Sequence, residues 1–334
     1  MNNARQPLLK LQKVSKRFVK ELDFAAKIAR KLGVSVSDET VHAVDKVDLS
    51  VFRGEVVGLV GESGCGKSTV GRLIAGLLPP SEGAIFFEGK DISLLKGREA
   101  TETALKIQMI FQDPFASLSP RMRVREIIGE APKIHGIFKP AELDENVDDL
   151  MSRCGLDPSY KYRYPHQFSG GQRQRIAIAR ALAVKAEYIV CDEAVSALDV
   201  SIQAQILNLF MALKRDFGLT LLFISHDLGV VEHISDRVAI MYLGRIVELA
   251  DTEELFDNPL HPYTKGLLKE VPSFDKRHIE FAAIRGEVAS PLNPPSGCHF
   301  HPRCPYAKDI CQLQQPLLEE IRPGHLLACH FGSV

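Results

Sequence analysis

The stretch Gly61-Glu62-Ser63-Gly64-Cys65-Gly66-Lys67-Ser68-Thr69 decides the fold, because it matches the glycine-rich loop that binds phosphate. It follows the apolar run 55–60, which predicts a buried strand, and precedes a helix expected over 70–78. Backbone N–H groups in such a loop bind phosphate oxygens, and glycines allow the close approach. Lys67 would supply charge to the β- and γ-phosphates, and Ser68 a hydroxyl to Mg²⁺. The loop alone predicts a nucleotide site.

The hydrophobic pattern outside the loop predicts strands that alternate with helices. This arrangement is typical of an α/β fold with a mainly parallel sheet and right-handed crossovers. The charge-rich segment of about 125–168 indicates a helical insertion. We expect strands over 8–13, 41–51, 55–60, 108–111, 188–191, 219–224, 238–243 and 246–249, and helices over 24–32, 70–78, 143–154, 175–184, 201–217 and 228–235.

A change of texture after residue 257 predicts two domains, 1–257 and 258–334. Prolines at 259, 262, 272, 291, 294 and 295 shorten the regular elements of the second part. Four of the seven cysteines fall there, namely Cys298, Cys304, Cys311 and Cys329. So small an irregular domain needs a staple to fold, and we expect a metal to supply it.

Composition excludes several classes of protein. The chain has 334 residues, of which 45% are apolar and 25% charged, and its net charge is −1, which is ordinary for a globular protein. A near-zero charge gives no electrostatic reason to expect nucleic acid as a partner. No apolar stretch approaches the roughly 20 residues of a membrane span, and residues 1–6 do not resemble a signal peptide. We expect a cytosolic chain.

Two acids after the predicted strand 188–191 are the candidates for metal binding and proton transfer. Asp192 would hold Mg²⁺ opposite Ser68 through the water shell of the ion. Glu193 would polarise the attacking water as a general base. An ordinary strand-to-loop transition explains such a pair equally well when it stands alone, and the phosphate loop favours the catalytic interpretation.

Further motifs occur in a fixed order along the chain: the phosphate loop, Gln112, Ser169-Gly170-Gly171-Gln172, Asp192-Glu193, Ser196-Ala197-Leu198-Asp199 and His226. The set resembles that of an ABC transporter ATPase subunit and covers about residues 8–255. The resemblance implies a P-loop NTPase core with a helical subdomain and an antiparallel β subdomain. It also implies ATP and Mg²⁺ as ligands and hydrolysis coupled to transport.

The resemblance assigns a role to each matching position. Gln112 would sense Mg²⁺ and link the ATPase to membrane subunits, and His226 would contact the γ-phosphate. The segment 169–172 would meet the nucleotide bound on the opposite subunit, and Asp199 would communicate across that dimer. Phe18 is the candidate for stacking on adenine, and the alternative for this residue is a place in the core.

The segment Asn258-Pro259-Leu260-His261-Pro262-Tyr263-Thr264 resembles the oligopeptide, dipeptide and nickel branch of ABC importers. The resemblance implies a second, related ATPase subunit, two permease subunits and an extracytoplasmic solute-binding protein. It places the chain at the cytoplasmic face of the membrane. Peptides, nickel, opines and glutathione-like molecules all remain open as cargo. The alternative is an ABC ATPase of DNA repair, chromosome structure or translation, but the chain lacks a coiled-coil insertion, a tandem second ATPase and a basic stripe.

The four tail cysteines are separated by five, six and seventeen residues, a spacing that no zinc-finger pattern has. Thiolates in a short tail suit an iron–sulfur cluster or Zn²⁺. The resemblance to importers with a similar tail implies a [4Fe–4S] cluster with a structural role. Zn²⁺ and free buried thiols are the alternatives. We expect the neighbouring His299, His301, His325 and His330 to be solvated and incidental.

Ala194 departs from the family pattern, which has proline directly after the catalytic glutamate. Proline fixes the backbone, so alanine leaves more freedom where Glu193 must be aimed. We predict that the chain still hydrolyses ATP and that Ala194→Pro changes the rate, as an ATPase assay would show. An unchanged rate would contradict this account.

Overall fold

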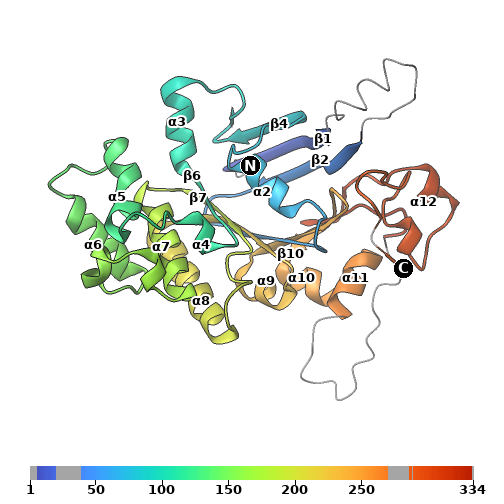
Figure 1. Cartoon of the computed structure of the whole chain (residues 1–334). Helices are drawn as coiled ribbons and strands as arrows, with labels where there is room; N and C mark the ends of the chain where they lie inside the picture. The colour runs from blue at the N-terminus through green and yellow to red at the C-terminus, as the bar shows by residue number, and fades with distance from the viewer. Residues whose placement is uncertain (1–5, 20–38, 270–285, 288, 333–334) are drawn as a thin grey trace, which may run out of the picture.

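The computed structural model describes residues 6–19, 39–269, 286–287 and 289–332. The helix predicted over 24–32 lies outside these ranges. In the described part of the chain, no helix has both the length and the apolar character needed to cross a membrane. Figure 1 shows a central sheet with a second, smaller sheet beside it and helices around both.

The smaller sheet is antiparallel and has the strand order β2-β1-β4-β5. It confirms the antiparallel β layer, although only the first two of its strands were predicted. The register of β1 against β2 shifts between Leu11 and Val14, so the ribbon bends there. The strands are β1 (Leu9–Val19), β2 (Thr40–Val51), β4 (Glu82–Phe87) and β5 (Lys90–Asp91).

The larger sheet has the order β11-β12-β10-β9-β3-β8-β7-β6. The five strands from β9 to β6 are parallel, and β10, β12 and β11 add to them antiparallel. Near-continuous apolar sequences explain why the parallel strands are buried on both faces. The strands are β3 (Val56–Val60), β6 (Ile107–Ile110), β7 (Tyr188–Asp192), β8 (Thr220–Ser225), β9 (Arg237–Tyr242), β10 (Arg245–Asp251), β11 (Glu319–Arg322) and β12 (His325–Leu327).

Helices cover the sheet, and α5 and α6, which lie in the segment predicted as a helical insertion, gather with α7 at one side of the molecule (Figure 1). Their apolar faces share one core with the parallel strands. The helices are α2 (Lys67–Ile74), α3 (Gly97–Lys106), α4 (Pro114–Ser117), α5 (Val124–Ile134), α6 (Leu143–Arg153), α7 (Gly170–Ala183), α8 (Val200–Phe217), α9 (Leu228–Ile234), α10 (Thr252–Asp257), α11 (Pro262–Lys269) and α12 (Asp309–Leu313).

The C-terminal segment continues the large sheet. Strand β12 pairs with β10, with Leu327 opposite Glu248. The carboxylate of Glu248 is fully buried and accepts hydrogen bonds from the N–H groups of Leu260 and His261, and it contacts Nε2 of His325 at 2.8 Å. The expectation that His325 is solvated was wrong, because the ring lies beside this carboxylate with 1% exposure.

Two buried residues with hydroxyl groups lie opposite each other on the neighbouring strands β7 and β8. Tyr188 lies opposite Thr220 in the ladder, and both side chains are fully buried. The hydroxyl of Thr220 accepts a hydrogen bond from the N–H of Gly54 at 2.9 Å. Among the residues that the structure describes, the hydroxyl of Tyr188 has no hydrogen-bond partner.

We predict that Tyr188→Phe leaves the free energy of unfolding unchanged or raises it by up to about 1 kcal/mol, because it removes a buried polar group that makes no hydrogen bond. Thr220→Val should lower it by about 1 kcal/mol, because it leaves the N–H of Gly54 unpaired. Urea denaturation of both variants compares the two effects. A Tyr188→Phe loss equal to that of Thr220→Val would contradict the assignment.

Candidate functional site

The phosphate loop joins β3 to α2 and is shaped by close backbone contacts. Gly64 and Gly66 have φ of +79° and +108°, which favours glycine. A Cβ at Gly61 would lie 2.1 Å from the carbonyl oxygen of Met241, and one at Gly66 would lie 2.1 Å from that of Ala43. Neither position therefore has room for a side chain. Helix α2 ends at Ile74 rather than at the predicted residue 78, because Gly76 takes a φ of +70°.

Lys67 brings a buried positive charge to this loop. Its side chain is 4% exposed, and its ammonium donates hydrogen bonds to the carbonyl oxygens of Gly61 at 2.6 Å and Glu62 at 3.0 Å. The N-terminus of α2 adds a partial positive charge at the same place. The loop can bind a polyanion such as the phosphates of a nucleotide.

The structure brings Ser68 and Asp192 together, as the sequence predicts. Ser68 Oγ on α2 donates to Asp192 Oδ1 at the end of β7 over 2.8 Å. Burial raises the pKa of Asp192, and the hydrogen bond from Ser68 opposes that shift. A hydroxyl and a carboxylate side by side at a phosphate loop suit Mg²⁺, which prefers oxygen ligands.

Glu193 lies between two polar side chains from neighbouring strands. Its Oε2 accepts a hydrogen bond from Nε2 of Gln112 at 2.8 Å and lies 3.6 Å from Nδ1 of His226. The three residues follow β7, β6 and β8, whose carboxyl ends meet at one edge because the strands are parallel. Glu193 has a φ of +48°, a backbone conformation that residues other than glycine rarely adopt.

The segment Ser169-Gly170-Gly171-Gln172 forms the start of α7, which begins five residues earlier than the predicted 175. Ser169 Oγ accepts from the N–H of Gln172, and Gln172 Oε1 accepts from the N–H of Ser169. Ser169 and Gly170 are exposed, and a Cβ at Gly171 would lie 2.6 Å from Ile202. The glycines therefore present an exposed helix N-terminus packed against α8.

Two further predicted residues are exposed. Asp199 is the residue before α8, and the side chain of its neighbour Val200 is 82% exposed, so this corner of the surface carries an uncovered apolar group. Phe18 on β1 is 41% exposed, with Nζ of Lys16 lying 5.3 Å from its ring centre. The alternative of a core position for Phe18 was wrong, and stacking on adenine stays a prediction.

The structure brings the four tail cysteines together. Cys298, Cys304, Cys311 and Cys329 line one small cavity, and all are free thiols. Burial and then the neighbouring thiols raise the pKa of Cys298 to about 11. In the described parts of the chain, no group of three His, Cys, Asp or Glu side chains is arranged to hold a metal ion.

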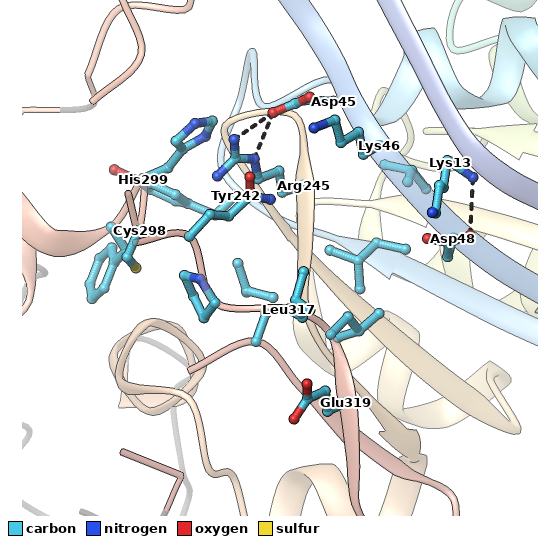
Figure 2. Close-up of a pocket in the computed structure, with 18 residues that line it drawn as sticks. Lys13, Asp45, Lys46, Asp48, Tyr242, Arg245, Cys298, His299, Leu317 and Glu319 are labelled. Atoms are coloured by element: carbon cyan, nitrogen blue, oxygen red, sulfur yellow. Dashed lines mark hydrogen bonds and ion pairs between the residues drawn. The ribbon is translucent and has the colours of Figure 1, made fainter. Parts of the chain in front are cut away.

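A separate cavity of about 470 Å³ lies between the N-terminal strands and the C-terminal segment. Figure 2 shows the ion pair of Asp45 with Arg245 next to Tyr242, Cys298 and His299, and Leu317 lower in the cavity. No residue of the phosphate loop lines it. His299 is buried here, contrary to expectation, with Nδ1 3.0 Å from the carbonyl oxygen of Leu243.

Sequence reasoning missed one charged group beside the phosphate loop. The guanidinium of Arg303 makes two hydrogen bonds with the carboxylate of Glu62, at 2.7 and 3.0 Å. The two residues are 241 positions apart, and neither lies in a pattern that predicts the contact.

Comparisons with known proteins agree with this geometry. The sequence model "ABC transporter" matches residues 44–196, and "Oligopeptide/dipeptide transporter, C-terminal region" matches residues 247–311. The oligopeptide transport ATP-binding protein AppF of Bacillus subtilis is 55% identical over 88% of this chain and 90% of its own length. A putative peptide import ATP-binding protein of Brucella ovis is 53% identical over 87% of this chain and 92% of its own length.

Solved structures of ABC transporter ATPases are also similar to this chain. CbiO1 of Clostridium perfringens, part of the ABC transporter complex cbiONQ, has a TM-score of 0.62 at 25% identity and covers 76% of this chain and 92% of its own. The ATP-binding cassette MJ0796, in a dimeric post-hydrolysis state with ADP and Pi, has a TM-score of 0.61 at 28% identity and covers 73% of this chain and 98% of its own. The chain belongs to the ABC transporter ATP-binding proteins, in the oligopeptide/dipeptide branch, and is an ATPase.

Proposed function

We propose that this chain is the ATP-hydrolysing subunit of a peptide-type ABC importer. The observation that carries the proposal is the arrangement of Glu193 between Gln112 and His226, next to the Ser68–Asp192 pair and the phosphate loop. AppF and the Brucella relative are named for oligopeptide transport and peptide import, and this likeness supports peptides as cargo.

The side chains of the site divide the work of hydrolysis. Lys67 and the loop N–H groups would bind the β- and γ-phosphates, and Ser68 and Asp192 would hold Mg²⁺. When bound, Mg²⁺ neutralises charge on the phosphates. Glu193 accepts the proton of the attacking water, Gln112 positions that carboxylate and senses the metal, and His226 contacts the γ-phosphate.

The exposed residues at the start of α7 and α8 would contact a second ATPase subunit. Ser169, Gly170 and Gly171 would bind the γ-phosphate of the nucleotide on the partner, because an uncovered helix N-terminus binds anions. Asp199 and the exposed Val200 would lie at the dimer surface. ATP-driven closure of the pair and its reopening after hydrolysis would move two permease subunits at the cytoplasmic face of the membrane. An extracytoplasmic solute-binding protein would select the cargo.

We predict that Glu193→Gln lowers kcat by about 10²- to 10⁴-fold, the usual contribution of a general base, and leaves ATP binding intact. Steady-state hydrolysis and binding of labelled ATP would be measured on the same preparations. Glu145→Gln, at an exposed position of α6, is the control and should hydrolyse ATP like the wild type. A Glu193→Gln enzyme with more than half of the wild-type rate would sink the assignment.

We further propose that the four tail cysteines hold a [4Fe–4S] cluster. The observation that supports the proposal is that the four thiols line one small cavity. Cys298, Cys304, Cys311 and Cys329 would bind the cluster as thiolates, the ligands that hold iron–sulfur clusters. It would join segments of the tail rather than carry electrons.

Anaerobic purification with iron, sulfide and zinc analysis tests the cluster. We predict about four iron and four sulfide per chain and their loss in Cys304→Ser, because each iron needs its thiolate. Cys154→Ala, which changes a buried cysteine of the helical region, should keep full iron content. A folded wild-type protein with zinc alone, or with no metal, would reject the proposal.

A further inference from the structure

Glu62, the second residue of the phosphate loop, makes hydrogen bonds through its carboxylate, its backbone N–H and its backbone carbonyl. Its carboxylate pairs with Arg303, its N–H donates to the hydroxyl of Tyr263 at 3.0 Å, and its carbonyl oxygen accepts from Lys67 Nζ at 3.0 Å. Two of these partners come from beyond residue 257, outside the nucleotide-binding motifs. The position of Lys67, which the phosphates need, thus depends on a residue that the C-terminal segment holds.

The Arg303–Glu62 pair has the geometry of a strong ion pair. Two parallel hydrogen bonds join the planar groups, with the Arg303 side chain 6% exposed and that of Glu62 24% exposed. Removing one partner of such a largely buried ion pair leaves an unneutralised charge. This lowers stability more than breaking an exposed ion pair does. Here the remaining charge would be a carboxylate in a loop that binds phosphates.

An aromatic cluster anchors these partners. The ring of Tyr242 at the end of β9 packs edge-on against Tyr263 and Phe300, with centroids 4.8 and 5.2 Å apart. The guanidinium of Arg303 lies 5.8 Å from the Tyr242 ring centre. All four side chains are largely buried, so Arg303 and Tyr263 have little freedom to move away from Glu62.

The same segment carries the cysteines. Arg303 directly precedes Cys304, and Phe300 lines the cysteine cavity. A second connection links the cysteine segment to the phosphate loop. His299 lies beside the carbonyl oxygen of Leu243. The N–H of the next residue, Gly244, donates a hydrogen bond to the carbonyl oxygen of Cys65 in the loop at 2.8 Å. The fold of the cysteine segment is thereby connected to the loop at two places.

We propose that Arg303 and Tyr263 are positioning residues of the ATP site, through which the cysteine-bearing segment sets the affinity of the phosphate loop for MgATP. The proposal rests on the ATPase function proposed above. Arg303 neutralises the Glu62 carboxylate, which would otherwise repel the triphosphate, and the Tyr263 hydroxyl fixes the backbone of the loop. Neither residue touches the reacting atoms.

The test measures the Kd for MgATP, steady-state kinetics and thermal unfolding on full-length variants. Arg303→Gln should raise Kd and KM about tenfold and leave kcat within about twofold, because the lost interaction is the same in ground and transition states. Arg303→Lys should be intermediate, and Tyr263→Phe should raise Kd about threefold. Arg322→Gln, which breaks the exposed pair with Glu254, is the matched control and should bind like the wild type.

A double variant separates positioning from mere stability. In Glu62→Gln/Arg303→Gln the repelling carboxylate is gone, so Kd should return to within about threefold of the wild type. An Arg303→Gln protein with wild-type Kd, or a double variant as weak as the single one, would overturn the proposal. A lower melting temperature with unchanged Kd would do so too. If Arg303→Gln does not fold, Arg303→Lys and Tyr263→Phe decide. A wild-type chain that does not bind MgATP would reject the proposed function instead.

Discussion

The close approach of backbone to backbone at the phosphate loop is the constraint on which the rest of the site depends. Carbonyl oxygens of Met241 and Ala43 lie where side chains at Gly61 and Gly66 would have to stand. One carbonyl belongs to the end of β9 and the other to β2, so both sheets shape the loop. A phosphate-binding surface made of N–H groups keeps its geometry only while these neighbours hold it.

The order of the strands in the large sheet determines which catalytic side chains lie next to one another. Because β7 lies between β8 and β6, the carboxylate that follows β7 stands between the side chains that follow its two neighbours. Glu193 therefore contacts Gln112 on one side and His226 on the other. Burial of β7 along its whole length fixes the backbone from which Asp192 and Glu193 project. The catalytic arrangement follows from a parallel sheet, in which all strands end at the same edge.

Local patterns predicted this part of the molecule well. Apolar runs that end in acids or glycine located β3, β7 and the loop, and the motif order identified the family. Glycines at 170 and 171 hid the true start of α7, because they are poor helix formers inside a helix and serve here as its first turn. Strands β11 and β12 and the Arg303–Glu62 pair join residues far apart in the chain, and no periodicity in a single sequence reports such contacts.

The pairing of β12 with β10 has a consequence for how the protein is made. During synthesis β10 is complete long before His325 and the last strand leave the ribosome. Until then the edge of β10 is uncovered, and the Glu248 carboxylate lacks its histidine. An open strand edge invites pairing with other chains. Residues 325–327 thus cover this sheet edge late in synthesis, and we expect newly made chains to be most open to edge pairing before β12 is in place.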